Sequence, residues 1–224
     1  MADRMNGIEL ISEEIVPLKH TDKGEKALQI MADLKVNHLP VLKKQNFVGV
    51  LSENDLLNQS DLSKQLTELF DHLPRPYVKG TSHIYEVLNI ASMDNLSVVP
   101  VLDDKENYLG CISVVHLLHK LADTGAIKEQ GGIIILEINM LDYSLAHISQ
   151  IIEGENAKVL SSFITSSPSS NKVELTLKIN RIELGSIIKA LIRYDYTIKA
   201  SFQRNSYDDD LKDRYDELMN YLKI

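Results

Sequence analysis

Two stretches decide the fold of this chain: Leu39-Pro40-Val41-Leu42 and, after a short polar turn, Gly49-Val50-Leu51-Ser52-Glu53-Asn54-Asp55. A second copy follows about sixty residues later as Val99-Pro100-Val101-Leu102 and Gly110-Cys111-Ile112-Ser113. The prolines coincide directly, and the glycines coincide once the turn of the second copy is given one extra residue. Because solenoid repeats have periods of about 20–50 residues, this longer period indicates a pair of αβ units packed against each other.

Each copy has the same order of elements. Apolar residues at helical spacing precede each Pro-Val-Leu stretch and predict a helix: Ala27, Ile30, Met31 and Leu34 in the first copy, and Ile84, Val87, Leu88 and Ala91 in the second. The two apolar runs around each polar turn predict a β-hairpin. Ser52 and Ser113 are expected to cap the helix that follows, since a serine hydroxyl can accept a bond from a first-turn N–H. A lead-in strand is expected near Ile15-Val16 and another near Tyr77-Val78.

After Gly131-Gly132 the pattern changes. Apolar periodicity predicts, in order, a strand, a helix, two strands, a helix and a strand, at residues 133–138, 145–152, 158–165, 172–179, 184–191 and 197–202. The order βαββαβ is the ferredoxin-like arrangement. A terminal amphipathic helix is expected over residues 205–224.

The predicted fold class is therefore α+β. It consists of two pseudo-symmetric β-α-β-β-α units, a C-terminal ferredoxin-like βαββαβ domain and a terminal helix. The expected boundaries of these four parts are residues 1–60, 61–125, 131–204 and 205–224.

Composition excludes several classes of function. The formal net charge of -8 disfavours binding to nucleic acid or to an anionic membrane. The sequence contains no run of about 18 apolar residues that would span a bilayer, and its first residues do not have the pattern of a secretion signal. The single cysteine, Cys111, excludes an internal disulfide and suits a reducing compartment. We therefore expect a cytoplasmic protein.

The duplicated unit resembles the cystathionine-β-synthase (CBS) domain, which occurs in pairs and carries Gly-apolar-apolar-Ser/Thr-x-x-Asp after its x-Pro-Val-Leu-like strand. The first copy matches the whole pattern, and the second has His116 where the aspartate is expected. This resemblance covers residues 8–121. Residues 132–203 resemble an ACT domain in element order, although the turn after the first strand has Asp142 and lacks the family's glycine. The combination is similar to the accessory proteins of acetoin utilisation.

The CBS resemblance implies an adenosine-type ligand, such as AMP, ADP, ATP, S-adenosylmethionine or NAD. Asp55 would accept hydrogen bonds from both ribose hydroxyls, because an ionised carboxylate has two acceptor oxygens. Ser52 would donate a hydrogen bond to a phosphate. The base would lie among apolar side chains and backbone groups that precede the motif: Ile15, Val16, Leu39, Pro40 and Val41.

The second copy is expected to be a weaker site, built on Ser113 and His116. A neutral imidazole has one acceptor nitrogen and cannot accept two ribose bonds. Positive charge for a phosphate is expected from the lead-in segments, which contain Lys19, His20, Arg75 and Lys79. A metal could bind His116 and His119, but no third ligand lies in register with them, so we expect no metal and no obligatory cofactor.

Three classes of function remain open. The first is a non-enzymatic regulator that senses an adenosine-type ligand and relays it, through dimer or domain rearrangement, to an unknown protein target. The second is a structural or interaction module whose ligand site is degenerate. The third, an enzyme, lacks any convergent set of acid, base and nucleophile. A homodimer is expected, because a four-stranded sheet has exposed edges and one face to cover.

Overall fold

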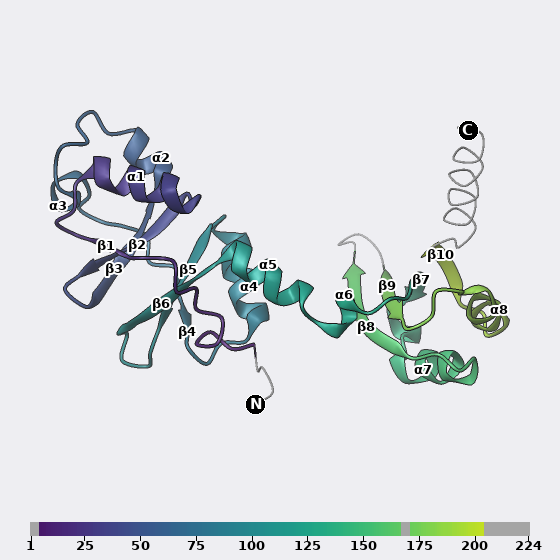
Figure 1. The fold of residues 1–224 in the computed structure, drawn as a ribbon. Helices are drawn as coiled ribbons and strands as arrows, with labels where there is room; N and C mark the ends of the chain where they lie inside the picture. Colours follow the sequence, from purple (N-terminus) through teal and green to yellow (C-terminus); the bar gives the residue numbers. More distant parts are fainter. Residues whose placement is uncertain (1–4, 167–170, 204–224) are drawn as a thin grey trace, which may run out of the picture. The chain divides into compact units, whose positions relative to one another are not determined.

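The structure is a computed structural model that describes residues 5–166 and 171–203. It divides the chain into two compact units, residues 1–122 and 123–224 (Figure 1). The helix predicted for residues 205–224 lies outside the described residues.

The first unit contains two three-stranded sheets of the same topology. In each sheet a short lead-in strand pairs parallel to a central strand, which forms an antiparallel hairpin with the third. The elements of the first repeat are β1 (Leu18–Lys19), α1 (Gly24–Leu34), β2 (His38–Lys43), β3 (Asn46–Ser52), α2 (Glu53–Leu57) and α3 (Leu66–Leu69). Those of the second are β4 (Val78–Lys79), α4 (Ile84–Met93), β5 (Val98–Leu102), β6 (Tyr108–Ser113) and α5 (Val114–Ala122). The predicted pseudo-symmetric αβ units are confirmed.

The first lead-in strand begins later than predicted. β4 starts at Val78, as expected, but β1 starts at Leu18, beyond Ile15-Val16. The preceding residues are held by the second repeat instead, because the Ser12 N–H donates to the Cys111 carbonyl at 2.9 Å and Ser12 Oγ accepts from the Ser113 N–H at 3.0 Å.

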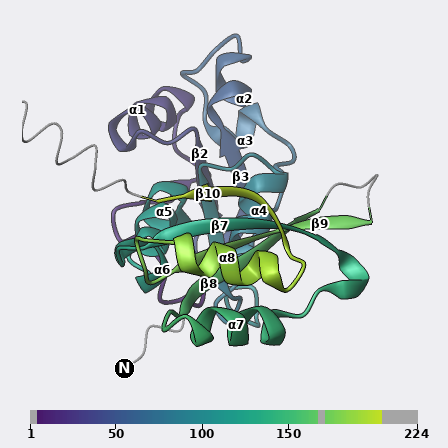
Figure 2. The same cartoon turned by 90° about the vertical axis from the view of Figure 1, so that its right-hand side faces the viewer.

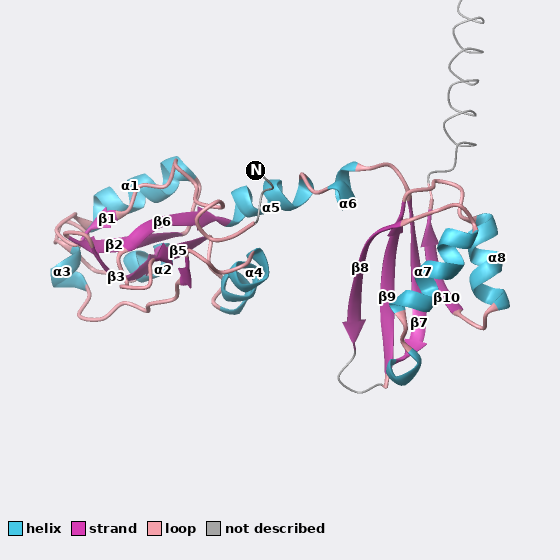
Figure 3. Ribbon diagram, turned by 90° about the horizontal axis from the view of Figure 1, so that it is seen from below, coloured by secondary structure: helices cyan, strands magenta, loops and turns pink. Residues whose placement is uncertain are grey.

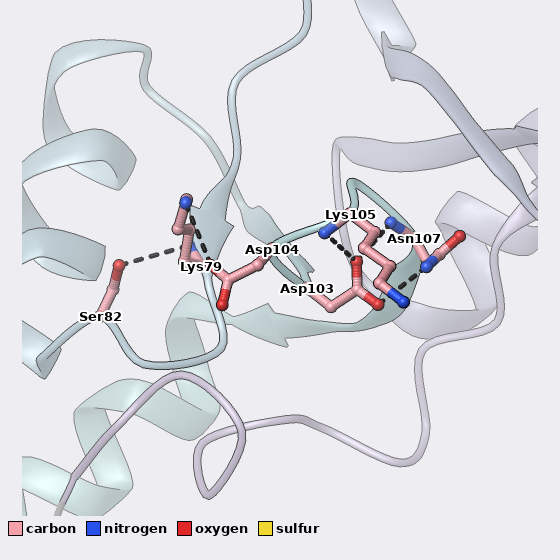
Figure 4. Close-up of polar contacts among 6 residues, drawn as sticks. All are labelled: Lys79, Ser82, Asp103, Asp104, Lys105 and Asn107. Atoms are coloured by element: carbon pink, nitrogen blue, oxygen red, sulfur yellow. Dashed lines mark hydrogen bonds and ion pairs between the residues drawn. The ribbon is translucent and has the colours of Figure 1, made fainter.

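The extra residue of the second hairpin is accommodated by one aspartate. Asp103 Oδ1 accepts from the backbone N–H groups of Lys105 and Asn107, both at 2.8 Å, and Oδ2 accepts from the Asn107 side-chain amide at 2.8 Å (Figure 4). At the edge of the same sheet, Lys79 Nζ lies 3.1 Å from a carboxylate oxygen of Asp104. These local bonds order the turn between β5 and β6.

The two repeats share their cores. Phe47 and Val50 of the first repeat lie in the core built mainly by the second, and Val98 and Cys111 of the second lie in the core of the first. The lead-in segment of each repeat also crosses the hairpin of the other. A Cβ at Gly49 would lie 2.6 Å from Leu73 Cβ and 2.7 Å from the Pro74 carbonyl oxygen, so a side chain there would block this crossing.

The second unit is a four-stranded antiparallel sheet of order β10-β7-β9-β8. Its elements are α6 (Gly125–Lys128), β7 (Gly132–Asn139), the 3₁₀ helix η1 (Met140–Asp142), α7 (Leu145–Gly154), β8 (Val159–Ser166), β9 (Lys172–Ile179), α8 (Gly185–Arg193) and β10 (Thr197–Phe202). β10 runs beside β7 (Figure 2), and α7 and α8 lie on the same face of the sheet (Figure 3). This is the predicted ferredoxin-like βαββαβ order, and the fold class is α+β.

The core of the second unit follows from the alternation of its strands. Every second residue of β7 and β9 is buried against α7 and α8, including Leu136, Leu175 and Leu177. The side chains on the other face are charged or half-buried, and Lys172 pairs with Glu137 there at 2.5 Å. None of the helices within residues 5–166 and 171–203 has the length and hydrophobicity that spanning a bilayer requires.

Candidate functional site

The motif of the first repeat forms a capping box at the junction of β3 and α2. Ser52 Oγ accepts from the Asp55 N–H at 3.1 Å, and Asp55 Oδ2 accepts from the Ser52 N–H at 3.3 Å. The Ser52 hydroxyl also donates to Asp55 Oδ2 at 2.6 Å. The predicted cap is therefore present, and it holds both side chains in fixed positions. Asp55 Oδ1 makes no hydrogen bond within residues 5–166 and 171–203.

A pocket of about 470 Å³ lies beside this capping box. Its lining combines the motif with a segment of the second repeat: His38, Val50, Ser52, Asp55, Pro74, Arg75, Pro76, Asp94 and Leu96. The Val50 N–H donates to the Pro74 carbonyl at 2.8 Å and fixes that segment against β3. The site is therefore formed by the motif of one repeat and the lead-in segment of the other.

Arg75 is the cationic residue in this lining. Its guanidinium lies 5.7 Å from the centre of the Phe47 ring, and Nη2 lies 3.3 Å from a carboxylate oxygen of Glu106. The side chain is 49% exposed, so these contacts orient the guanidinium while leaving it accessible. An oriented, accessible guanidinium is suited to bind a phosphate.

His38 borders the same pocket and has a perturbed acidity. Burial lowers the pKa of His38, and the nearby Asp55 carboxylate opposes this shift. The neutral imidazole is therefore favoured in the folded chain. His38 was not among the predicted site residues, because its position as the first residue of β2 gives no signal of a pocket.

The base-binding residues predicted in β2 do not line this pocket. Leu39 and Val41 are 0% and 1% exposed and belong to the core of the first repeat, and Pro40 is also buried. The reason is that β2 is the central strand of its sheet. Val41 pairs with Leu18 on one side and with Gly49 on the other, so its backbone lies within the sheet.

Ile15 and Val16, the predicted lead-in residues of the first repeat, do not line the pocket beside Ser52 and Asp55. Ile15 lines a pocket of about 620 Å³ together with Ser113 and His116, and Val16 is 60% exposed and lines none of the pockets described here. In the structure Ile15 therefore lies beside the second motif and not beside Ser52 and Asp55, because the lead-in segments cross between repeats.

Of the four cations expected to meet a phosphate, Arg75 is the one that lines the first motif's pocket. His20 lies beside β2, where its N–H donates to the Leu42 carbonyl at 2.9 Å and its carbonyl accepts from the Thr67 N–H at 3.1 Å. Lys79 pairs with Asp104. Neither residue belongs to the lining of this pocket.

The second motif has a different environment. Ser113 Oγ accepts from the His116 N–H at 3.0 Å, so the predicted cap of α5 is present. The lining of its pocket includes three carboxylates and three groups that can carry positive charge: Glu9, Glu13, Glu14, His116, His119 and Lys120. Within the described ranges, no group of three His, Cys, Asp or Glu side chains is arranged to hold a metal ion.

The turn after the first strand of the second unit forms η1. Asn139 Oδ1 accepts from the Leu141 N–H at 3.3 Å, and Leu141 itself is 93% exposed. Ser144 then caps α7 by accepting from the His147 N–H at 3.3 Å. This turn lacks the glycine of the ACT pattern, and its conformation is fixed instead by hydrogen bonds from its own backbone to the Asn139 and Ser144 side chains.

Comparison with known proteins gives one family match. The model of the family described as CBS domain matches residues 8–61, which confirms the resemblance for the first repeat. Among solved structures, the chain is similar to a CBS domain pair/ACT domain protein from Thermotoga maritima, with 21% identity and a TM-score of 0.48, covering 53% of this chain and 98% of that one. It is also similar to a putative acetoin utilization protein (AcuB) from Vibrio cholerae, with 18% identity and a TM-score of 0.46, covering 53% and 90%. A structure of CBSX2 in complex with AMP matches with 18% identity and a TM-score of 0.44, covering 52% and 95%.

Proposed function

We propose that this chain, whose residues 8–61 match the CBS domain, is a non-enzymatic regulatory protein that binds an adenosine-type ligand beside Ser52 and Asp55. The ligand classes are AMP, ADP, ATP, S-adenosylmethionine and NAD. One observation carries the proposal: the capping-box carboxylate and the Arg75 guanidinium line one pocket of about 470 Å³. This volume lies within the range of about 300–1,000 Å³ of small-molecule sites.

Asp55 supplies the ribose recognition in this proposal. The capping box uses Oδ2 and fixes the carboxylate, so that Oδ1 is the acceptor for a ribose hydroxyl. A carboxylate held by the protein accepts hydrogen bonds without first having to be ordered by the ligand, which favours affinity. Val50, Leu96, Pro74 and Pro76 supply apolar surface for the base.

Arg75 supplies the phosphate recognition. Asp94 lines the same pocket, and its carboxylate would repel a phosphate, so Arg75 is the group in this lining that attracts it. Binding of a phosphate would draw Arg75 from Glu106 toward the ligand. Because Arg75 lies next to Pro74, which bonds to Val50, this movement would reach β3 and the contact between the two repeats.

We propose that the signal passes to a protein target through rearrangement of a homodimer or of the two units, and that the protein acts in the cytoplasm. Such a rearrangement requires the ligand to bind the two states with different affinity, because a ligand shifts the equilibrium only by that difference. Light scattering at twice 25.3 kDa would support the dimer, and a value of 25.3 kDa would exclude it.

The capping box also favours an alternative. Ser52 and Asp55 satisfy each other's hydrogen bonds, so the motif has a structural role even without a ligand. In this alternative the chain is an interaction module with a degenerate site that acts as a scaffold for a partner protein.

A thermal-shift screen separates the two. The full chain is tested with AMP, ADP, ATP, S-adenosylmethionine, NAD and adenosine. A ligand at one hundred times its dissociation constant stabilises the folded state by about 2.7 kcal/mol, which raises the melting temperature by a few degrees. No shift with any of these at millimolar concentration would support the scaffold alternative.

Three variants assign the site. Asp55→Ala is expected to abolish the shift, whereas Asp94→Asn, a carboxylate of the same pocket outside the capping box, should preserve it. Arg75→Gln is expected to weaken ATP or AMP binding about 10- to 100-fold, the value of a charge-assisted hydrogen bond, and to leave adenosine binding nearly unchanged. Equal loss of adenosine and ATP in Arg75→Gln would contradict the phosphate role.

A further inference from the structure

The two repeats are joined by a contact between His38, the first residue of β2, and Ser97, the residue before β5. His38 Nδ1 accepts from the Ser97 N–H at 3.2 Å and lies 3.3 Å from Ser97 Oγ. Ser97 Oγ in turn accepts from the Asn37 N–H at 2.9 Å. Asn37 and Ser97 occupy equivalent places in the two repeats, so this contact lies where the repeats meet.

Asn37 and Ser97 each also accept a hydrogen bond from the first residue of the helix that follows the hairpin of the same repeat. The Asn37 carbonyl accepts from the N–H of Glu53, the first residue of α2, at 2.8 Å. The Ser97 carbonyl accepts from the N–H of Val114, the first residue of α5, at 3.0 Å. A continuous series of hydrogen bonds thus runs from the start of α2, which carries Asp55, to the start of α5.

The Ser97 N–H fixes the chemical state of His38. A backbone N–H can only donate, so Nδ1 must be unprotonated and the proton of the neutral ring must lie on Nε2. An imidazolium carries hydrogen on both nitrogens and cannot accept this bond. Protonation of His38 would therefore break the bond from the Ser97 N–H and leave Nδ1–H only Ser97 Oγ as a partner at this contact.

Charged groups face His38 from both sides. The first motif's pocket contributes Asp55, Arg75 and Asp94. A neighbouring pocket of about 560 Å³, which His38 also lines, contributes Glu14, Asp33 and Lys35. Burial lowers the pKa of His38 and the Asp55 carboxylate opposes this shift, so the neutral imidazole is favoured in the folded chain.

We propose that His38 is a positioning residue that couples the ligand pocket of the first repeat to helix α5 of the second, and that it does so only as the neutral imidazole. The ligand part of this coupling rests on the proposed function above. The link between the repeats stands on the geometry alone and can be tested without a ligand.

The ligand-free test is an NMR pH titration of the full chain. The ring nitrogen signals are expected to show the Nε2–H tautomer of His38. The amide signals of Ser97, Val114 and Glu53 should move with the same midpoint as the ring. A His38 ring in the Nδ1–H tautomer, or amides of Val114 and Glu53 that do not follow the ring, would overturn the link.

Two substitutions form a matched pair for this titration. His38→Asn places an amide oxygen near the position of Nδ1, where it can accept from Ser97 and cannot be protonated. Its amide signals should remain near the high-pH positions of the wild type throughout. His38→Gln carries its amide further from the backbone and should place the Val114 amide signal near its low-pH position at every pH. A midpoint that persists in His38→Asn would show that another group causes the titration.

The ligand test uses AMP as the probe. AMP is expected to shift the Val114 amide in wild type and in His38→Asn, and to bind His38→Gln up to about tenfold more weakly, the effect of one lost hydrogen bond. Equal affinity and an equal Val114 shift in all three proteins would overturn the coupling. If neither AMP nor any other nucleotide binds the wild type, the proposed function and the coupling to a ligand fail together, and the ligand-free titration still decides the link.

Discussion

Replacement of Gly49 by alanine should disturb both the fold and the candidate site, because Gly49 lies where the lead-in segment of the second repeat crosses β3. A Cβ built on Gly49 would lie 2.6 Å from Leu73 Cβ and 2.7 Å from the Pro74 carbonyl oxygen. Ordinary van der Waals contact begins at 3.4 Å, so the segment would have to move by about 0.7–0.8 Å.

The same movement would weaken the hydrogen bond that holds the lead-in segment of the second repeat against β3. The bond from the Val50 N–H to the Pro74 carbonyl is 2.8 Å long, and the same displacement would stretch it to about the limit of a hydrogen bond. Overpacking of this kind costs about 1–3 kcal/mol. We therefore expect Gly49→Ala to lower the free energy of unfolding of the first unit by about 1–3 kcal/mol. Because Pro74 precedes Arg75, nucleotide affinity should fall as well.

The assay must report on each unit separately, since a chain with two compact units need not unfold in one step. Hydrogen exchange read by mass spectrometry at increasing urea concentration does this, using peptides from β3 and from α7. Gly154→Ala is the matched control, because a Cβ at Gly154 in α7 meets nothing within 4 Å. It should stabilise the second unit by up to about 1 kcal/mol, as alanine replaces glycine in a helix.

A Gly49→Ala variant whose first unit has a free energy of unfolding within about 0.5 kcal/mol of wild type, the range of neutral surface substitutions, would contradict this prediction. The lead-in segment would then be free to move away from β3 at little cost. The pocket wall formed by Pro74 and Arg75 would not be fixed as the structure shows.

Two further predictions concern single groups whose pKa is shifted by the fold. Cys111 is fully buried, and burial raises the pKa of its thiol to about 12, so alkylating reagents should label it only as fast as the first unit unfolds. Labelling of the native chain at the rate of a free cysteine would contradict this. Burial lowers the pKa of His38 below its ordinary value of 6.5, so the unfolded chain binds a proton that the native chain does not. The stability of the first unit should therefore fall as pH decreases from 6.5 toward the lowered pKa, and urea midpoints for His38→Asn should lack this component; an equal slope in both proteins would contradict it.

Much of the fold could be predicted because its signals are local. The alternation of β9 between Lys172 and Ile179 and the helical stripes of α7 and α8 depend only on neighbours in sequence, and their predicted bounds agree with the structure within about two residues. The caps at Ser52 and Ser113 are also local, since each serine bonds to an N–H three residues ahead. Such elements are determined by periodicity and capping, which a single sequence displays.

The pairing of lead-in segments with motifs could not be predicted in the same way. Ile15 could in principle face the motif of its own repeat or that of the other, and both choices satisfy the same local pattern. The choice depends on contacts between residues about one hundred positions apart, such as Ser12 with Ser113. A glycine inside a strand, as at Gly49 and Gly110, does indicate close approach of another backbone, but it does not say which one.

Because of the crossed pairing, the lead-in segments that line the two pockets carry charges of opposite sign. The lead-in segment that meets Ser52 and Asp55 carries Arg75, whereas the one that meets His116 carries Glu13 and Glu14. The second pocket thus has His116 in place of the ribose-accepting aspartate, and its lead-in segment carries carboxylates that repel a phosphate, which are two independent reasons against nucleotide binding.

We therefore expect one nucleotide per chain, bound in the first motif's pocket. Isothermal titration with AMP should give a stoichiometry of one per chain in wild type, and Asp55→Ala should remove all of the binding. A stoichiometry of two, or binding that survives in Asp55→Ala, would show that the pocket beside His116 accepts a nucleotide despite its carboxylates. The charge of the lead-in segments would then not determine which pocket is occupied, and the role assigned to Arg75 would lose its electrostatic basis.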